Sequence, residues 1–157
     1  AVLQDALRCD VVLMAAAVAD FRPAQVAPHK IKKGGGRLTL ELEPTADILL
    51  ALAGVRKPGE MPRLVVGFAA ESQDLLANAL KKLSAKKLDM IVANDISASD
   101  AGFGVDTNRV TLLYADGRRE ELPLLPKAEV AEEVIQRVVG MVEANKSSTK
   151  GTKDTKE

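Results

Sequence analysis

The chain has 157 residues, of which 46% are hydrophobic and 28% charged, and its formal net charge is zero. These values are typical of one globular domain and exclude a largely disordered or fibrous chain. One cysteine and one histidine exclude an internal disulfide and a zinc site of cysteine and histidine ligands. With few aromatic residues, no basic excess and no apolar run of roughly 18 residues, we expect no nucleic-acid or membrane partner.

Three apolar segments, 11–20, 63–71 and 89–95, are predicted to be strands of one sheet. Each is almost continuously apolar, which is typical of parallel strands covered on both faces. Helices are predicted at 1–10, 46–55, 73–88 and 128–145, with Thr45 and Ser72 as the N-caps of the second and third. This alternation predicts an α/β fold: a three-layer, Rossmann-like, mostly parallel sheet with helices on both faces.

The segment between the first strand and the second helix is predicted to leave the sheet as a β-flap. Residues 21–36 contain two prolines and three consecutive glycines, and 37–45 alternates as a half-exposed strand. A hairpin is predicted at 109–125, with its turn near Asp116 and Gly117. The segment 146–157 lacks apolar residues, so we expect a disordered tail after a domain at 1–145.

Side-chain patterns give further expectations. Cys9 is expected to pack as a small apolar residue, and His29 is expected to be an exposed loop residue. The helix at 128–145 has an apolar stripe formed by Val130, Val134, Val138, Met141 and Val142. The helix at 73–88 has an apolar face formed by Leu75, Leu76, Ala79, Leu80 and Leu83.

Candidate site residues follow the predicted strands. Ligands of open α/β sheets bind beyond the carboxyl ends of the strands, and small residues there let a ligand approach the backbone. The same alanines and glycines fit plain helix packing equally well. The polar and aromatic residues at the three strand ends are Asp20, Phe21, Phe68, Glu71, Asn94 and Asp95.

Two groups of lysines are candidates for binding an anion. Lys30, Lys32 and Lys33 lie beside the glycine run, where a mobile loop can close over phosphates, although a solvated turn explains them more simply. Lys82 and Lys86 are four residues apart and share one helix face, which a bound anion or the helix dipole would stabilise. The glycine run lacks the spacing of a P-loop.

Taken together, these segments resemble bacterial phosphopantothenate–cysteine ligase over about residues 11–142. The motifs that carry the resemblance are MAAAVADFRP, APHKIKK, PTADI, VVGFAAE, KKLSAKKLDMIVAND and GFGVDTNRVTLL. The resemblance implies a cytoplasmic enzyme that uses CTP and Mg²⁺ to join 4′-phosphopantothenate to L-cysteine through an acyl-cytidylate. It also implies a homodimer formed through the flap at 28–45. FMN would belong only to an upstream decarboxylase domain that such ligases often follow.

The resemblance also implies roles for individual residues. Lys30 would be the catalytic lysine, essential for cytidylate formation, and Asp20 would serve the ribose or the metal-bound phosphates. Phe68 would pack in the nucleotide pocket, and Ala46 replaces a proline usual in the family. The implied CTP-binding set is Met14, Ala15, Ala16, Asp20, Lys30, Ala46, Asp47, Ile48, Leu49, Phe68, Lys82 and Lys86, with Asp20 also a metal ligand.

One departure from the family concerns the front of the domain. The glycine-rich strand–loop and the Asn-Ser-Ser-Gly-Lys segment of the family do not precede Ala1. We therefore expect 1–145 to be the C-terminal part of a ligase domain within a longer protein. Two other hypotheses stay open. One is an NAD(P)-binding oxidoreductase-like domain, against which no GxGxxG occurs between a strand and a helix. The other is a nucleotide-binding or dimerisation module without activity of its own.

Overall fold

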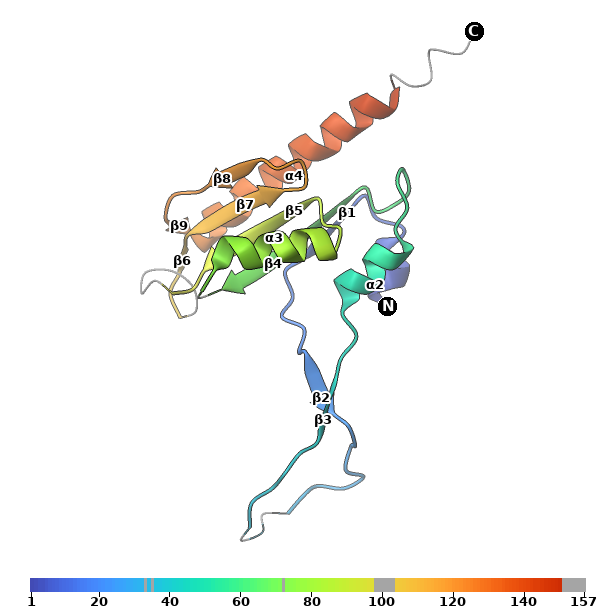
Figure 1. Cartoon of the computed structure of the whole chain (residues 1–157), viewed down its shortest axis with the longest axis vertical. Helices are drawn as coiled ribbons and strands as arrows, with labels where there is room; N and C mark the ends of the chain where they lie inside the picture. Colours follow the sequence, from blue (N-terminus) through green and yellow to red (C-terminus); the bar gives the residue numbers. More distant parts are fainter. Residues whose placement is uncertain (33, 35, 72, 98–103, 151–157) are drawn as a thin grey trace.

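The computed structural model describes residues 1–32, 34, 36–71, 73–97 and 104–150. Its centre is a five-stranded sheet in the order β1-β4-β5-β7-β8 (Figure 1). Three strands, β1 (Val11–Met14), β4 (Leu64–Glu71) and β5 (Met90–Asp95), run parallel. The hairpin of β7 (Val110–Tyr114) and β8 (Arg119–Glu121) extends the sheet antiparallel. This confirms the three predicted strands and the predicted hairpin, whose turn contains Gly117 at φ +89°.

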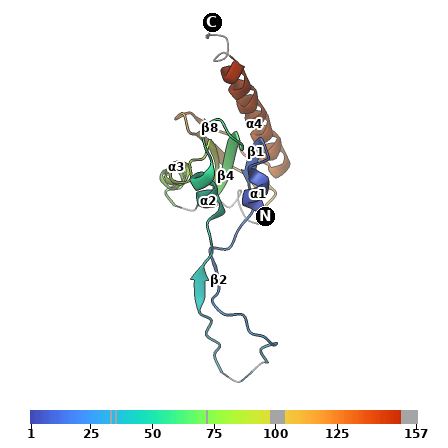
Figure 2. The ribbon, with the colours of Figure 1, turned by 90° about the vertical axis from the view of Figure 1, so that its right-hand side faces the viewer.

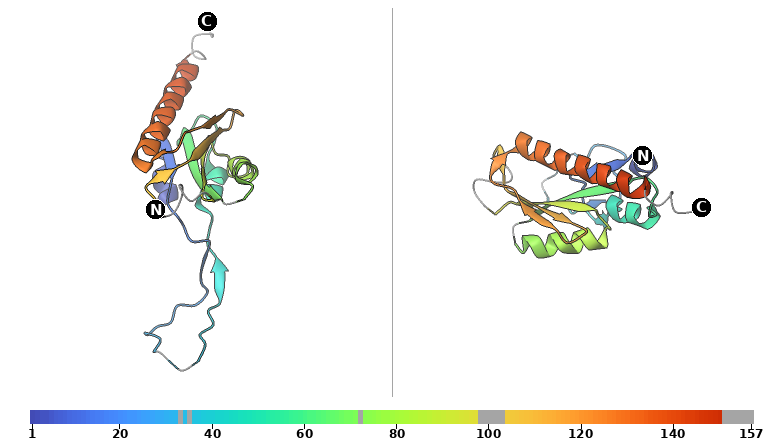
Figure 3. Two further views of the ribbon diagram at one scale, coloured as in Figure 1. Left: turned by 90° about the vertical axis from the view of Figure 1, so that its left-hand side faces the viewer. Right: turned by 90° about the horizontal axis from the view of Figure 1, so that it is seen from above.

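Helices cover both faces of the sheet, so the predicted three-layer architecture is confirmed (Figure 3). α1 (Val2–Ala6), α2 (Ile48–Val55) and α3 (Leu75–Ala85) pack on one face, and α4 (Lys127–Lys150) packs on the other. The core of the first face includes Leu52, Val65, Ala79, Ile91 and Leu113. The core of the second face includes Leu64, Val66, Met90, Leu112 and Val134.

The predicted apolar helix faces are confirmed with one exception. On α4, Val130, Val134 and Val138 are buried, and Met141 and Val142 pack against them. On α3, Ala79 and Leu83 are buried, but Leu80 is 50% exposed, so its assignment to the buried face is wrong. Leu80 lies one residue past Ala79, which is about 100° around a helix of 3.6 residues per turn. Its side chain therefore lies beside the buried face of the helix and not on it.

The flap leaves the sheet as a long extension (Figures 1 and 2). At its base, β2 (Phe21–Pro23) and β3 (Leu42–Pro44) pair antiparallel. The strand predicted at 37–45 is therefore reduced to three residues, because 37–41 packs on no core. The strand predicted at 11–20 ends at Met14, and Leu13 is 41% exposed rather than buried. The reason is that, among the described strands, β1 lies at the edge of the sheet beside β4.

Several element ends also differ from expectation. The N-cap of α2 is Asp47 and not Thr45, and the cap predicted at Ser72 lies outside the described residues. Cys9 is exposed, and its thiol donates to the Asp5 carbonyl at 3.2 Å, because α1 ends before it and leaves it outside the core. His29 is exposed, as expected.

The C-terminal helix is longer than predicted. α4 continues to Lys150, into the segment expected to be disordered from 146, and residues 151–157 lie outside the described part. A helix need not pack along its whole length once a packed N-terminal half has nucleated it. None of the helices in the described residues is both long and apolar enough to cross a membrane. Two short strands, β6 (Thr107–Asn108) and β9 (Leu125–Pro126), pair just before α4.

Candidate functional site

A cavity of about 160 Å³ lies where the chain leaves β1 and where α2 begins. This is the carboxyl edge of the parallel strands, at which ligands of α/β sheets bind. Four parts of the chain line it: the end of β1 with the outgoing flap arm, the start of α2, β4 and the end of α3. The lining residues are Met14, Ala16, Val18, Ala19, Asp20, Thr45, Ala46, Asp47, Ile48, Leu49, Phe68 and Lys86.

Most of the predicted nucleotide-binding residues therefore meet in one cavity. The exceptions are Ala15, Lys30 and Lys82, which do not line it. Lys30 is exposed on the flap, beyond the β2–β3 ribbon. Three lining residues, Val18, Ala19 and Thr45, were not in the predicted set. Val18 and Ala19 belong to the predicted strand 11–20 and become lining residues because β1 ends early.

Asp47 links α2 and α3 at the floor of this cavity. Its carboxylate accepts the Leu50 N–H at 3.0 Å as the helix N-cap, and it lies 2.9 Å from the Lys86 ammonium. Burial opposes ionisation of Asp47, but the bonds from Leu50 and Lys86 outweigh it and lower the pKa of its carboxyl. Asp47 is therefore an anion that holds Lys86 at the cavity.

Thr45 ties the two arms of the flap together at the cavity rim. Its backbone N–H donates to the Asp20 carbonyl at 2.9 Å, and its hydroxyl donates to the Ala19 carbonyl. One step further out, Arg22 and Glu43 form an ion pair across the β2–β3 ribbon, with Nη2 and Oε1 2.6 Å apart. The flap is thus anchored beside the residues that line the cavity.

Phe68 lies at the cavity with a partly exposed ring. It follows four buried residues of β4 and is 42% exposed. The preceding Gly67 lets two side chains approach the strand closely. A Cβ there would lie 2.6 Å from Cδ1 of Leu88, which precedes β5, and 3.7 Å from Cδ1 of Leu49 in α2. The start of α2 thus packs near the middle of β4, where Leu49 and Phe68 line the same cavity.

Lys82 lies one helical turn before Lys86 and is paired with a different carboxylate. Its ammonium is 2.5 Å from Glu71 Oε1, at the end of β4. Of the other predicted strand-end residues, Asn94 and Asp95 end β5 and do not line the cavity. Among the described residues, Asn94 Oδ1 is a buried oxygen that lacks a hydrogen-bond partner.

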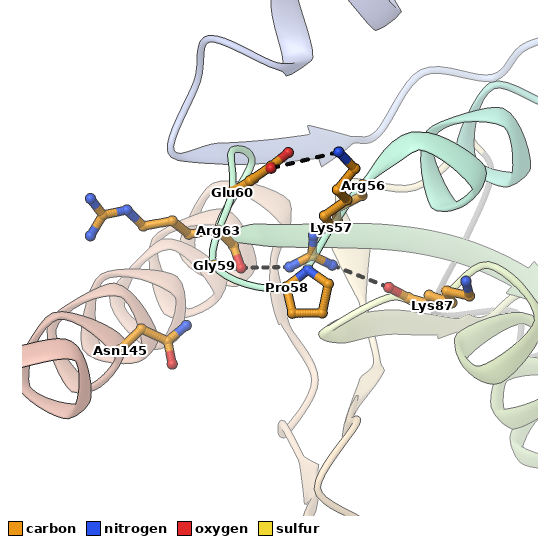
Figure 4. A pocket seen from close by; sticks show the side chains of 8 residues that line it. All are labelled: Arg56, Lys57, Pro58, Gly59, Glu60, Arg63, Lys87 and Asn145. Atoms are coloured by element: carbon orange, nitrogen blue, oxygen red, sulfur yellow. Dashed lines mark hydrogen bonds and ion pairs between the residues drawn. The ribbon is translucent and has the colours of Figure 1, made fainter. Parts of the chain in front are cut away.

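A larger cavity of about 570 Å³ lies at the opposite end of β4 (Figure 4). Its central cation, Arg56, is already saturated. The guanidinium donates to the backbone carbonyls of Pro62, Arg63 and Lys87. It also lies 2.8 Å from Asp89 Oδ2. This arrangement fixes the loop before β4 and leaves Arg56 little capacity for a ligand.

The small cavity can accept a magnesium ion that arrives with phosphates. Asp20 and Asp47 both line it, and Mg²⁺ is usually held by one or two carboxylates together with substrate phosphates. No group of three or more histidine, cysteine, aspartate or glutamate side chains in the described residues could hold a metal by itself. Because Asp47 is already paired with Lys86, Asp20 is the carboxylate of this lining that would contact a metal ion bound to phosphates.

Comparison with known proteins identifies the family of the chain. Residues 1–141 match the DNA/pantothenate metabolism flavoprotein C-terminal domain. The chain belongs to this family. The coenzyme A biosynthesis bifunctional protein CoaBC of Bacillus subtilis is 49% identical over 132 residues, which are 84% of this chain and 32% of that protein. The chain thus spans less than half the length of this relative of the family.

Two solved structures have a similar fold. The C-terminal domain of a coenzyme A biosynthesis bifunctional protein CoaBC superposes with a TM-score of 0.70 at 38% identity, over 91% of this chain and 60% of that one. A Cab2 mutant in complex with phosphopantothenate-cysteine superposes with a TM-score of 0.68 at 18% identity, over 95% of this chain and 50% of that one. The resemblance found in the sequence is confirmed.

Proposed function

We propose that this chain is the nucleotide-binding part of a ligase that joins 4′-phosphopantothenate to L-cysteine with CTP. The observation that carries the proposal is the cavity at the carboxyl edge of β1, in which residues from four parts of the chain meet. A family relative is named for coenzyme A biosynthesis, and one of similar fold was solved with phosphopantothenate-cysteine.

The cavity lining has one lysine and two aspartates, so such a reaction needs further cations from the flap and from a metal ion. The substrate carboxylate attacks the α-phosphorus of CTP, pyrophosphate leaves, and the cysteine amino group then displaces CMP from the acyl-cytidylate. Negative charge builds at the α-phosphate, and positive groups must offset it. Lys86 and the N-terminus of α2 lie at the cavity, and Lys30 on the flap supplies the catalytic ammonium.

Mg²⁺, held by Asp20 with the nucleotide phosphates, would neutralise part of the phosphate charge. FMN is not proposed for this chain, because it belongs to the upstream decarboxylase domain of such proteins. The proposed location is the cytoplasm.

The flap supports a homodimer formed through residues 28–45. Ile31, Leu38 and Leu40 are each more than half exposed, on a segment that projects away from its own core (Figure 2). Exposed apolar side chains gathered on one extension are typical of an interface. We propose that a second copy of the chain covers them.

The test is thermal unfolding of this chain with magnesium and CTP, set against ATP, GTP and NADH. A ligand at hundredfold excess over its Kd stabilises the fold by about 2.7 kcal/mol. A shift with CTP alone is expected. Phe68→Ala should remove the shift, whereas Val139→Ala, at a 50% exposed position on α4, should keep it. A shift with NADH and none with CTP would favour the oxidoreductase-like hypothesis instead.

A further inference from the structure

Two lysines of α3 each have a carboxylate partner at the carboxyl edge of the sheet. Lys86 Nζ lies 2.9 Å from Asp47 Oδ2, and Lys82 Nζ lies 2.5 Å from Glu71 Oε1. The lysines are four residues apart, so their Cα atoms are separated by about 6 Å along the helix. The carboxylates come from two different elements, the start of α2 and the end of β4. Two carboxylates from different elements thus lie beside a row of two lysines, Lys82 and Lys86.

The pair at Glu71 has one further partner. The Glu71 side chain is only 18% exposed, whereas that of Lys82 is 43% exposed, so the ammonium has more freedom to turn outward than the carboxylate. Asn78, one turn before Lys82 on α3, lies with Nδ2 3.5 Å from the second Glu71 oxygen and 3.2 Å from the Gln73 carbonyl. Glu71 therefore keeps a donor nearby when Lys82 moves away.

Charge explains why the carboxylates are there. Two ammonium groups at positions i and i+4 of a helix repel each other. A carboxylate beside each one offsets that repulsion and keeps both ammonium groups at this edge. Carboxylate and phosphate oxygens accept the same charge-assisted hydrogen bonds from lysine. A polyphosphate that reaches the two lysines can therefore replace the carboxylates as their hydrogen-bond acceptor. A carboxylate that stays beside the bound polyphosphate would repel it.

We propose that Glu71 is a positioning residue that holds Lys82 in place of a phosphate, and that a bound nucleotide polyphosphate displaces it. This inference rests on the proposed function. In the exchange, Lys82 leaves Glu71 for a phosphate oxygen, and Glu71 turns to Asn78. No covalent bond changes.

The test compares nucleotide affinity by calorimetry for three proteins: wild type, Glu71→Gln and Glu60→Gln. Glutamine keeps the size of residue 71 but removes the competing charge. Glu60 is a matched control, since it forms an exposed ion pair with Lys57 at 3.8 Å beside the opposite end of β4. With Mg·CTP or tripolyphosphate as the probe, Glu71→Gln should bind about twofold to fivefold more tightly, as expected for removing a partly exposed ion pair. Glu60→Gln should bind like wild type.

Ionic strength gives a second readout that a merely structural role would not move. The gain in Glu71→Gln should shrink as salt rises, because salt screens the repulsion by Glu71. Asn78→Ala should weaken binding, because Glu71 then has no second donor when Lys82 leaves. If Glu71→Gln fails to fold, Asn78→Ala tests the proposal in its place.

The outcomes separate the two proposals. If the wild-type chain binds neither probe, the proposed function and this exchange are both overturned. If wild type binds and Glu71→Gln binds equally or more weakly, the exchange alone is overturned and Glu71 only supports the fold.

Discussion

Asp47 and Lys86 connect the N-cap of α2 to the C-cap of α3 through one ion pair of 2.9 Å. The same carboxylate caps α2 through Leu50. Asp47 therefore has two functions that different substitutions can separate. Asparagine is as good an N-cap as aspartate but cannot pair with Lys86, whereas alanine can do neither.

We expect Asp47→Ala to lower the free energy of unfolding by about 1 kcal/mol through loss of the cap. Asp47→Asn should lower it by less, since an exposed ion pair contributes about 0.2–1 kcal/mol. Urea unfolding at neutral pH measures both. Equal losses in the two variants would contradict the importance of the cap.

The lowered pKa of Asp47 predicts how this stability depends on pH. A carboxyl whose pKa is lower in the folded state stabilises the fold above its unfolded value, near 3.8. That contribution is lost as the pH falls through the lower, folded value. The Tm of wild type should therefore exceed that of Asp47→Asn at neutral pH, and the two should converge in acid. Other carboxyl groups titrate in both proteins, so the difference isolates Asp47. A gap that widens in acid would refute the assignment.

Gly67 is predicted to tolerate no side chain. In Gly67→Ala, the new Cβ would lie 2.6 Å from the buried Leu88, so the core must shift. Such overpacking costs about 1–3 kcal/mol, which thermal unfolding would measure. Gly54→Ala is the control, because a Cβ there meets no atom within 4 Å. Alanine in a helix should stabilise by up to about 1 kcal/mol relative to glycine. If both variants have the same stability, the contact at Gly67 is unimportant.

Lys30→Gln should abolish cytidylate formation in the full-length protein that contains this chain. The substitution removes the flap ammonium proposed to offset charge at the α-phosphate, and because Lys30 is exposed it should leave Tm unchanged. Release of pyrophosphate from CTP measures the step. Lys32→Gln, two residues further along the same exposed segment, is the matched control. Normal turnover of Lys30→Gln would exclude a catalytic role for this lysine.

The proposed flap dimer predicts that the double variant Leu38→Glu, Leu40→Glu is monomeric. Both side chains are more than half exposed in the single chain, so their replacement should not lower Tm. Thr39→Glu adds a charge between them and serves as the control. Sedimentation at several concentrations distinguishes the two states. A double variant that sediments as wild type would place the interface elsewhere.

The sequence predicted the layers of this fold because its buried segments are unambiguous. Strands β4 and β5 each begin with four buried residues and become polar only at their ends, and the α4 stripe repeats with helical period. The wrong strand predictions concern segments whose structure depends on their neighbours in the fold. No pattern in 11–20 states that β1 is an edge strand, and the alternation in 37–45 cannot reveal that most of it lacks a core to pack against.

The candidate site was predictable in composition but not in its internal contacts. The family motifs indicate that Asp47 and Phe68 belong to one pocket, and the structure brings them together. Which carboxylate pairs with which lysine depends on the relative placement of α2, β4 and α3, which local sequence does not encode. The sequence indicated Glu71 as a candidate because it ends a predicted strand. That Lys82 is its partner follows only from the packing of α3 against β4.

The outer edge of β1 is a second place at which another strand can pair. β1 pairs with β4 on one side, and no strand of the described residues pairs with its other side, so backbone groups along Val11–Met14 can accept a further strand. An edge-to-edge dimer would survive the substitutions at Leu38 and Leu40. It would slow amide hydrogen exchange along Val11–Met14 as concentration rises, whereas a flap dimer would slow exchange in 28–45. Exchange mapping can therefore identify which contact a sedimenting dimer uses.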